Sequence, residues 1–328
     1  MILDVILPTF NREALLARTL DSLCAAPVPA GMSVRILVVD NASTDGTRAL
    51  IRRQSERFGG RLQYLFVPTP GKPHALNAGI AATDGDLIGL IDDDEEIDAG
   101  WFACIRREMM NPAIDFIGGK CLPRWESPRP SWLGTGYLGV VGWVDPGDTA
   151  KAMDESYPGI LMGGNAVVRR RLLERAGPYS TALNRTGARL LGCEDEDMYH
   201  RLLAIGARGR YVPELVIHHH VPAARLTKAY FRRWCFWRGV SLGVMDRSRP
   251  APVAYLAGIP RYRVGRALRG VCGLLASLTP WRRSDDAARF EHELACWDLA
   301  GFFWGKHVHR VEPAAVVDNR ALDREHLA

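Results

Sequence analysis

One stretch of this chain constrains the fold more than any other. A nearly all-apolar run, Asp86 to Ile91, leads directly into five acids, Asp92 to Glu96. A strand of that composition is buried on both faces, as in a parallel sheet covered by helices. Upstream, short β-rich runs alternate with segments of helical periodicity, the order typical of parallel strands joined by helical crossovers. We therefore predict an α/β fold with a Rossmann-like, mixed but mostly parallel sheet flanked by helices.

The N-terminal part of this sheet follows from periodicity. Strands are expected over 3–7, 33–39, 62–67 and 86–91, and helices over 12–23, 47–58 and 74–82. The first, second and fourth of these strands end in polar clusters. Because ligands of open parallel sheets bind beyond the carboxyl ends of the strands, we expect the functional site at that edge.

The later part of the chain is less regular. Residues 123–158 are rich in Trp, Pro and Gly, which predicts a long loop region over the site. We expect regular structure to return with a helix over 170–175, an acidic helix over 193–201 and a strand over 211–217. The chain then divides into an α/β domain, 1–222, which includes the loop region, and a helical, basic region, 223–328.

Composition excludes several classes of protein. With 328 residues, 47% of them hydrophobic, the chain can bury a full core, so it is no small structural module. The net charge of +5 is too small to indicate nucleic-acid binding. Seven widely spaced cysteines fit neither a disulfide framework nor a zinc site. Since neither a secretory signal nor a membrane-spanning run is evident, we predict a cytoplasmic protein whose membrane contact, if any, is peripheral.

The acids Asp92, Asp93 and Asp94 follow a buried strand, where their charge is costly unless a cation or hydrogen bonds compensate it. A hard divalent ion does so, and it is commonly held by one or two carboxylates together with substrate phosphates. We therefore predict Mn²⁺ or Mg²⁺ as cofactor. The pattern leaves an alternative open, a solvated loop in which Asp94 or Glu95 caps the next helix.

A second acidic cluster, Glu194 to Asp197, opens the predicted helix over 193–201. The helix dipole favours acids at this end, so part of the cluster can be structural. Four acids in succession exceed that requirement. A carboxylate held in a cleft by such a turn can take the proton of a hydroxyl as general base.

Three histidines, His218, His219 and His220, follow the predicted strand over 211–217. Neighbouring side chains of an extended segment point to opposite faces, so at most one or two can reach one metal ion. One metal ligand among them fits the acidic surroundings. Ordinary surface or core histidines are the alternative.

Six motifs together resemble a known family. They are Pro8 to Arg12, Val38 to Thr47, Lys72 to Gly79, Leu90 to Glu95, Gly163-Gly164-Asn165 and Glu194 to Arg201. Each motif alone is weak, but in this order and at these spacings they resemble the family 2 glycosyltransferases, inverting enzymes of the GT-A fold. The resemblance implies an enzyme that moves one sugar from a nucleotide-diphosphate sugar onto an acceptor hydroxyl.

The resemblance also implies a role for individual residues. Asp195 would be the catalytic base, and Asp94 and His219 would be the metal ligands. Thr9 and Asp40 would contact the nucleotide base, and Asp92 the ribose side of the donor. Lys72 would lie near the base or the diphosphate, and Gly164 and Asn165 near the donor sugar. Further substrate contacts are implied for Pro8, Asn11, Arg12, Asn77, Asp93, Glu194, Arg201 and Trp234.

Two departures from the family pattern bear on these roles. The middle position of the family's Asp-x-Asp motif is a third acid, Asp93, which leaves the division of labour within the triplet open. The Gln-x-x-Arg-Trp motif of processive synthases is not cleanly present, because Tyr230 stands in place of the Gln before Arg233 and Trp234. We therefore predict transfer of a single sugar and no polymerisation.

The acceptor side is expected in the 123–158 loop region. Its aromatic side chains suit the apolar face of a sugar ring, with ordinary packing as the alternative; they are Trp125, Trp132, Tyr137 and Trp143. Beyond residue 222, Arg263, Arg266 and Arg269 recur at helical spacing among apolar residues and are followed by Trp281-Arg282-Arg283. This pattern fits either an anionic membrane interface or a packed helix with a solvated Arg face. In the first case a lipid-linked saccharide is the natural acceptor.

Other classes of function compete with this interpretation. A nucleotidyltransferase would need a Gly-rich basic loop for a triphosphate, which Pro8 to Asn11 does not supply. A non-catalytic sugar-binding module would have no use for Asp195. Nucleic-acid binding would rest on the basic stretch alone. We expect a UDP-sugar as donor, and a saccharide or lipid-linked saccharide of cell-surface polysaccharide or glycan synthesis as acceptor.

Overall fold

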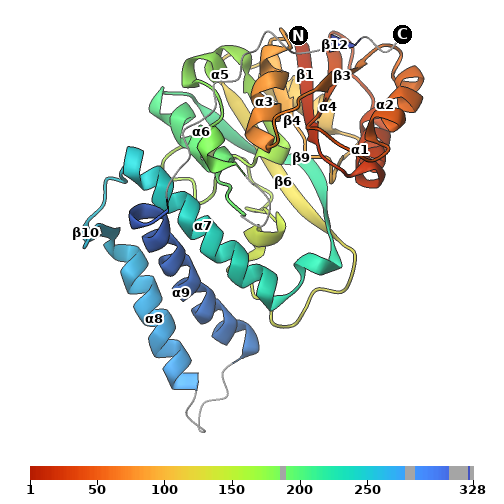
Figure 1. Ribbon diagram of the computed structural model, residues 1–328. Helices are drawn as coiled ribbons and strands as arrows, with labels where there is room; N and C mark the ends of the chain where they lie inside the picture. Colours follow the sequence, from red (N-terminus) through yellow and green to blue (C-terminus); the bar gives the residue numbers. More distant parts are fainter. Residues whose placement is uncertain (185–189, 278–284, 310–323, 326–328) are drawn as a thin grey trace.

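Figure 1 shows the computed structural model, which describes residues 1–184, 190–277, 285–309 and 324–325. An α/β unit holds one large sheet, and helices α7 (Lys228–Ser248), α8 (Arg261–Ser277) and α9 (Asp286–His307) project from it. The predicted α/β architecture with a helical C-terminal extension is confirmed.

The sheet has the strand order β12-β3-β2-β1-β4-β8-β6-β9-β5 in the described part of the chain, with β7 also paired to β9. Strands β1 to β4 run parallel to one another, and antiparallel pairs enter with β8, β5 and β7, so the sheet is mixed as predicted. The strands are β1 (Ile2–Thr9), β2 (Ser33–Asp40), β3 (Leu62–Phe66), β4 (Leu87–Leu90), β5 (Glu95–Ile97), β6 (Phe116–Trp125), β7 (Lys151–Met153), β8 (Ala166–Arg169), β9 (Gly209–Val221) and β12 (Arg324–Glu325).

Helices cover both faces of this sheet. One layer contains α1 (Glu13–Ala25), α2 (Thr47–Ser55) and α4 (Trp101–Met109), and the other contains α3 (Lys72–Ala81), α5 (Arg170–Ala176) and α6 (Glu194–Ala204). Successive residues of a strand point to opposite faces. Accordingly, Val5 of β1 packs in the first layer and Ile6 in the second.

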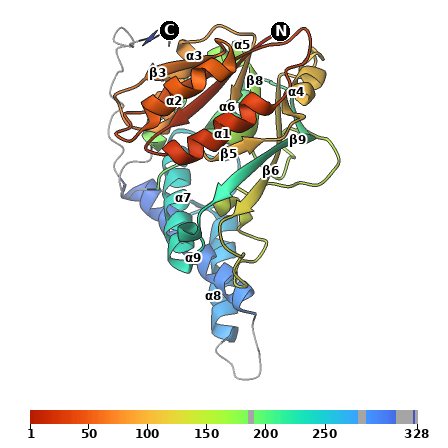
Figure 2. The ribbon, with the colours of Figure 1, turned by 90° about the vertical axis from the view of Figure 1, so that its right-hand side faces the viewer.

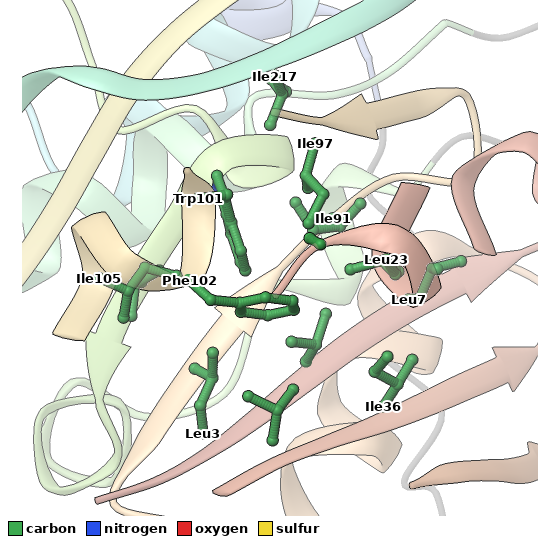
Figure 3. Close-up of a cluster of buried hydrophobic side chains, with 14 of the residues drawn as sticks. Leu3, Leu7, Leu23, Ile36, Ile91, Ile97, Trp101, Phe102, Ile105 and Ile217 are labelled. Atoms are coloured by element: carbon green, nitrogen blue, oxygen red, sulfur yellow. The ribbon is translucent and has the colours of Figure 1, made fainter. Parts of the chain in front are cut away.

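Figure 3 shows part of the first layer, where Trp101 and Phe102 of α4 pack with Leu3 of β1 and Ile36 of β2. All four side chains are fully buried. Burying each of them contributes roughly 1.5–3 kcal/mol to stability. This packing fixes α4 and the parallel strands that lead to the site.

Three segments differ from the sequence prediction. The helix expected over 47–58 ends at Ser55 and continues as a 3-10 turn, η1 (Glu56–Phe58). The loop region begins with the end of β6 and also contains η2 (Leu138–Val141) and β7. Strand β9 extends to Val221 because it pairs with β6 as far as Trp125, so the three histidines lie within the strand and not after it.

In the C-terminal region, α9 packs between α7 and α8. Figures 1 and 2 agree that this group extends away from the sheet, with α8 outermost. A third apolar cluster joins it to the α/β unit, with Leu133 and Val141 on one side and Phe231 and Phe290 on the other. Among the described helices, none is long and apolar enough to cross a membrane. Trp281-Arg282-Arg283 lies outside the described residues.

Candidate active site

The ends of three neighbouring strands bring the first site residues together. Strand β1 lies between β2 and β4, so Thr9 meets both Asp40 and the acids that follow β4. The Thr9 hydroxyl donates to Oδ2 of Asp93 over 2.8 Å. Asp40 is buried and accepts hydrogen bonds from the Tyr64 hydroxyl (2.9 Å) and the Ser43 N–H (2.8 Å). The carboxyl ends of these strands therefore form one polar floor, as expected.

The turn after β1 ties this floor together. Pro8 is buried in β1, and Asn11 adopts a left-handed φ of 52° and accepts a hydrogen bond from the N–H of Thr44 over 2.7 Å. Arg12 then reaches back, with its Nη1 2.8 Å from Oδ1 of Asp93 and 2.9 Å from Oδ2 of Asp94. Burial raises the pKa of Asp93 to about 6 against the opposing charge of Arg12. The acids are buried, which rules out the solvated loop.

Asp94 and His219 lie next to each other across two strands. Their Oδ2 and Nε2 atoms are 3.6 Å apart. Nδ1 of His219 lies 2.9 Å from the carbonyl oxygen of Val141. Because a carbonyl only accepts, Nδ1 carries a proton, and Nε2 is the ring nitrogen turned to Asp94. Burial alone would raise the pKa of Asp94, but His219 and the guanidinium groups of Arg12 and Arg225 hold it below its ordinary value.

The pair fits a divalent ion that is shared with a substrate. An ionised carboxylate and an imidazole nitrogen are suitable donors, and two neighbouring ligands of an octahedral ion lie about 3 Å apart. The contact to Val141 is the kind of hydrogen bond that orients a metal-binding imidazole. In the described residues no group of three or more acidic, His or Cys side chains is assembled as a metal site. Phosphate oxygens and water would therefore have to complete the coordination.

Lys72 joins the two acidic clusters. Its Nζ is 2.7 Å from Oδ1 of Asp92 and 4.0 Å from Oε1 of Glu194. Burial lowers the pKa of Lys72, but Asp92, Asp195 and Glu194 outweigh this and raise it well above the usual value. A fixed positive charge therefore stands between the two acidic clusters.

Asp195 occupies the first turn of α6. The helix follows Cys193, whose left-handed φ of 69° turns the chain into it. The carboxyl group packs on Gly163, where any Cβ would overlap it. Its Oδ1 is inaccessible to solvent and has no hydrogen-bond partner among the described residues. Burial raises the pKa of Asp195 to about 7; Lys72 opposes this shift, and Glu194 and Asp92 add to it.

Gly164 and Asn165 have structural contacts that sequence reasoning did not predict. A Cβ at Gly164 would overlap the carboxyl group of Glu95. The Asn165 amide donates to the carbonyls of Lys120 (2.9 Å) and Leu215 (2.8 Å) and accepts from the indole of Trp101 (2.9 Å). Asn165 is fully buried and its amide is engaged on both sides, so its side chain joins β6, β9 and α4; its predicted place near the donor sugar stays a prediction.

Three other predicted substrate contacts have structural partners instead. Asn77 exchanges hydrogen bonds with the backbone of Tyr179 (2.8 and 2.9 Å). Arg201 pairs with Asp197 and donates to the carbonyls of Ala176 and Gly177. Trp234 packs against the third apolar cluster. Their polar groups or rings join elements of the fold, and their contacts with substrate stay predictions.

Arg225 and Glu95 were missed by sequence reasoning. Arg225 lies 3.6 Å from Oδ2 of Asp94 and 3.4 Å from Nε2 of His219, and it precedes α7. No local motif marks it, although it follows the histidines by only a few residues. Glu95 is fully buried and accepts the N–H of Asp92 over 2.8 Å. The sequence signal for Glu95 was its place in the acidic run Asp92 to Glu96.

The loop region contacts the site through η2. Trp132 packs edge-on against Phe231 and Phe290, both at 5.1 Å, so it belongs to the core of the junction. Trp143 instead lines an open hollow of about 380 Å³ together with Thr135, Gly136, Leu138, Gly139 and Asp145. This hollow adjoins the turn that holds His219.

Comparison with known proteins gives a family and a fold. The family described as glycosyl transferase family 2 matches residues 4–177. Succinoglycan biosynthesis protein ExoM of Rhizobium meliloti (strain 1021) is 24% identical over 244 residues, which are 74% of this chain and 74% of that protein.

Two solved structures share the fold. A mannosyltransferase from Pyrobaculum calidifontis, in complex with GDP-Man and Mn²⁺, superposes with a TM-score of 0.61 at 20% identity, over 92% of this chain and 86% of the other. Residues 1–349 of S. aureus TarS, in complex with UDP, superpose with a TM-score of 0.51 at 16% identity, over 99% and 97% of the two chains.

Proposed function

This chain belongs to glycosyl transferase family 2, and from that premise we propose that it transfers one sugar from a nucleotide-diphosphate sugar to an acceptor hydroxyl, with inversion at the anomeric carbon. The observation that carries the proposal is Oδ1 of Asp195, a buried carboxylate oxygen without a hydrogen-bond partner among the described residues. A buried polar atom of this kind costs stability unless a ligand meets it.

The donor would bind at the floor made by β1, β2 and β4. Thr9 and Asp40 lie at the ends of two of these strands and would contact the nucleotide base. Asp92 and Lys72 would lie on the side of the ribose and the diphosphate. A UDP-sugar is our first choice. The mannosyltransferase with this fold was solved with GDP-Man and TarS with UDP, so the nucleotide is a question for experiment.

Asp94 and His219 would hold a divalent ion, Mn²⁺ or Mg²⁺. When bound, that ion would neutralise the negative charge that grows on the departing diphosphate. Arg12 and Arg225 both lie at Asp94 and add two fixed positive charges beside the same position. They would orient the diphosphate and remain with it as the bond to the sugar breaks.

Asp195 would act as the base. With a pKa raised to about 7, its carboxylate is a stronger proton acceptor than an exposed aspartate, and at neutral pH about half of it is deprotonated and available. It would take the proton of the acceptor hydroxyl while the oxygen attacks the anomeric carbon from the side opposite the diphosphate. A single displacement of this kind inverts the anomeric centre.

The acceptor would approach from the 123–158 loop region. The hollow beside Trp143 offers an aromatic face and the carboxylate of Asp145, a combination that suits a sugar ring. The relative ExoM is named for succinoglycan biosynthesis. We infer a saccharide or lipid-linked saccharide of polysaccharide synthesis as acceptor, and a single transfer per encounter.

A thermal-shift screen tests the donor site. UDP-, GDP- and dTDP-sugars are each added with and without Mn²⁺, because a ligand that binds only the folded state raises its melting temperature. We expect one nucleotide class to stabilise the protein in a Mn²⁺-dependent manner. Asp94→Ala should remove the metal dependence, and Glu174→Gln, an exposed acid on α5, should not.

Two results would count against the proposal. Absence of any shift with all three nucleotides would contradict a donor site at the β1, β2 and β4 ends. A shift that does not depend on metal, or that persists with its metal dependence in Asp94→Ala, would contradict the role of Asp94.

Metal-dependent hydrolysis of the same nucleotide-sugar would distinguish an enzyme from a non-catalytic sugar-binding module.

A further inference from the structure

Helix α8 leaves an apolar stripe uncovered. Leu268 and Leu275 are each 60% exposed, and Val271 and Cys272 between them are exposed as well. Their spacing of three, four and seven residues places all four on one side of the helix. On its other side α8 buries Ala267 and Gly270 against α9. Helix α8 therefore packs its small residues against α9 and exposes its large apolar residues to solvent.

Helix α9 and the hairpin before α8 add to this surface. Phe303 is 50% exposed, and Trp297 and Trp304 are exposed on the same helix. The hairpin formed by β10 (Tyr255–Leu256) and β11 (Ile259–Pro260) presents Leu256 to solvent, and its Gly258 approaches the ring of His307 at the end of α9. Large apolar residues exposed on three neighbouring elements are typical of an interaction site.

The two stripes lie on the same side of the α8–α9 pair. Arg266 of α8 donates to the Tyr137 hydroxyl over 2.9 Å, and Glu291 of α9 accepts the Gly136 N–H over 2.9 Å, so both helices turn these residues to the loop region. At about 100° per residue, Leu268 and Leu275 lie nearly opposite Arg266, and Trp304 lies about 140° from Glu291. By this geometry both stripes face away from the loop region. The helices that carry them project from the α/β unit (Figures 1 and 2).

The charge on helix α8 has one sign, whereas on α9 Glu293 accepts a hydrogen bond from the indole of Trp297 over 3.1 Å. Helix α8 carries four arginines and no acid. Arg263 binds Asp298, whereas Arg261, Arg266 and Arg269 are exposed; of these three, Arg266 donates to the Tyr137 hydroxyl. An exposed apolar stripe with tryptophans and flanking arginines is the composition of surfaces that lie in the interface of an anionic membrane.

We propose that the outer face of α8 and α9, together with the β10–β11 hairpin, docks on an anionic membrane surface. The apolar stripe and the tryptophans enter the boundary between headgroups and acyl chains, and Arg261 and Arg269 contact lipid phosphates. The docking itself goes beyond the proposed function. Its consequence, that a lipid-linked acceptor is delivered to the site, rests on that function.

A second copy of the chain is the main competing occupant. In a two-fold contact through this face, the arginines of both copies would approach one another. Helix α8 supplies no acid to pair with them, and Glu293 of α9 is already paired with Arg232. Like charges at short range oppose such a contact. Anionic lipid headgroups carry the charge opposite to that of the arginines, so this surface fits a membrane better than a second copy of the chain.

Co-sedimentation of the full-length protein with vesicles tests the proposal. Vesicles of phosphatidylcholine are compared with vesicles that also contain phosphatidylglycerol, without nucleotide, so that the result does not depend on sugar transfer. We expect binding to the anionic vesicles that weakens as salt is added. Leu268→Asp with Leu275→Asp, and separately Arg261→Gln with Arg269→Gln, should each weaken it by about tenfold or more.

Met110→Asp is the matched control, since Met110 is 61% exposed at the end of α4, in the α/β unit. It should bind vesicles like the unchanged protein. All changed residues are in solvent, and unaltered melting temperatures and donor-induced shifts would show that fold and donor site are intact. Failure of the donor screen with retained vesicle binding would leave the docking surface standing.

Three outcomes would overturn the proposal. These are no binding to anionic vesicles by the unchanged protein, equal binding to neutral vesicles, and unchanged binding by the Leu268/Leu275 variant. Size-exclusion chromatography with light scattering adds a fourth. A dimer that the same two substitutions dissolve would assign the face to a second copy of the chain.

Discussion

The carboxyl group of Asp195 differs from the other acids of the site in what compensates its charge. Asp93 and Asp94 have arginine partners within 2.9 Å, and Asp92 has Lys72 within 2.8 Å. One oxygen of Asp195 has no partner among the described residues, and burial raises its pKa to about 7. A group that needs a proton or a donor to complete its environment is suited to general-base catalysis.

This carboxyl group predicts the pH dependence of transfer. The base works only when deprotonated, and its pKa is about 7, so kcat/KM should be low at pH 6 and rise to a plateau above pH 8. Replacing Lys72 with Met removes a positive charge that opposes the shift, so the midpoint should move to higher pH. The measurement is kcat/KM against pH for both proteins with the donor found by the screen.

A midpoint near the ordinary value for aspartate, at about pH 4, would contradict this assignment. A Lys72→Met profile that moves to lower pH would contradict the electrostatic account, because it has the opposite sign. A lower plateau for Lys72→Met is compatible with either result, since Lys72 also faces the donor side.

Individual residues were predictable where the chain shows a local pattern. Asp94, Asp195 and the histidine group stand out as acids or imidazoles next to strand and helix ends. The choice of His219 among the three depends on β9 pairing with β5, which brings it beside Asp94. Arg225 depends on the path of the chain after β9 and has no local signal.

Asn165 shows how one element positions another. Strands β6 and β9 are in register up to Gly119 and Val212, and then their pairing shifts, so that Lys120 faces Val216. The amide of Asn165 donates to carbonyls on both strands at this irregularity. Beyond it, β9 carries His219 into the site. The structural contribution of the Gly163-Gly164-Asn165 motif is therefore to hold β6 and β9 in the arrangement that places His219.

Asn165→Ala should lower the free energy of unfolding by about 2–4 kcal/mol, because three buried partners lose their hydrogen bond. We also expect a smaller Mn²⁺-dependent shift by the donor, since His219 loses its fixed position. Chemical denaturation and the thermal-shift assay measure the two effects. Asn111→Ala, whose side chain bonds only a neighbouring backbone N–H in an exposed turn, is the control.

An Asn165 variant of unchanged stability would contradict this account of the motif. A variant of lower stability that keeps the full metal-dependent shift would limit Asn165 to the core and remove its link to His219. Either result is distinguishable from loss of folding, because the shift is measured relative to the variant's own melting temperature.

The elements of the first half were predictable because each obeys a local rule. The strand and helix over 3–23 have clean apolar periodicity and a polar end, and both form as expected. Strand β9 was predicted too short, since three histidines interrupt its apolar pattern before Val221 and are held in the sheet by β6 and β5. Such pairing between distant segments leaves no trace in a local pattern.

For the whole molecule, the order of strands was beyond the sequence prediction. Strand β8 inserts between β4 and β6, which places the Gly163-Gly164-Asn165 motif beside the acids after β4. The family resemblance, not periodicity, indicated that these segments meet. The helical character of residues after 222 was foreseen, but its junction with the loop region through Trp132, Phe231 and Phe290 was not.

The junction between the loop region and the C-terminal helices also positions two residues of the candidate site. Arg225 stands between β9 and α7, in contact with Asp94, and Val141 of the loop region holds the ring of His219. The C-terminal helices and the loop region are thus joined to Asp94 and His219, the proposed metal ligands. A chain docked on a membrane through α8 and α9 would hold its donor site close to a lipid-linked acceptor in that membrane.

The central claim is that Asp195 drives transfer of one sugar to an acceptor hydroxyl. The most direct test compares the unchanged protein, Asp195→Asn and the control Glu174→Gln for release of nucleoside diphosphate in the presence of acceptor. The account predicts that Asp195→Asn loses about a thousandfold in rate while its donor-induced thermal shift is retained. Near-normal transfer by Asp195→Asn, with the same shift, would contradict it.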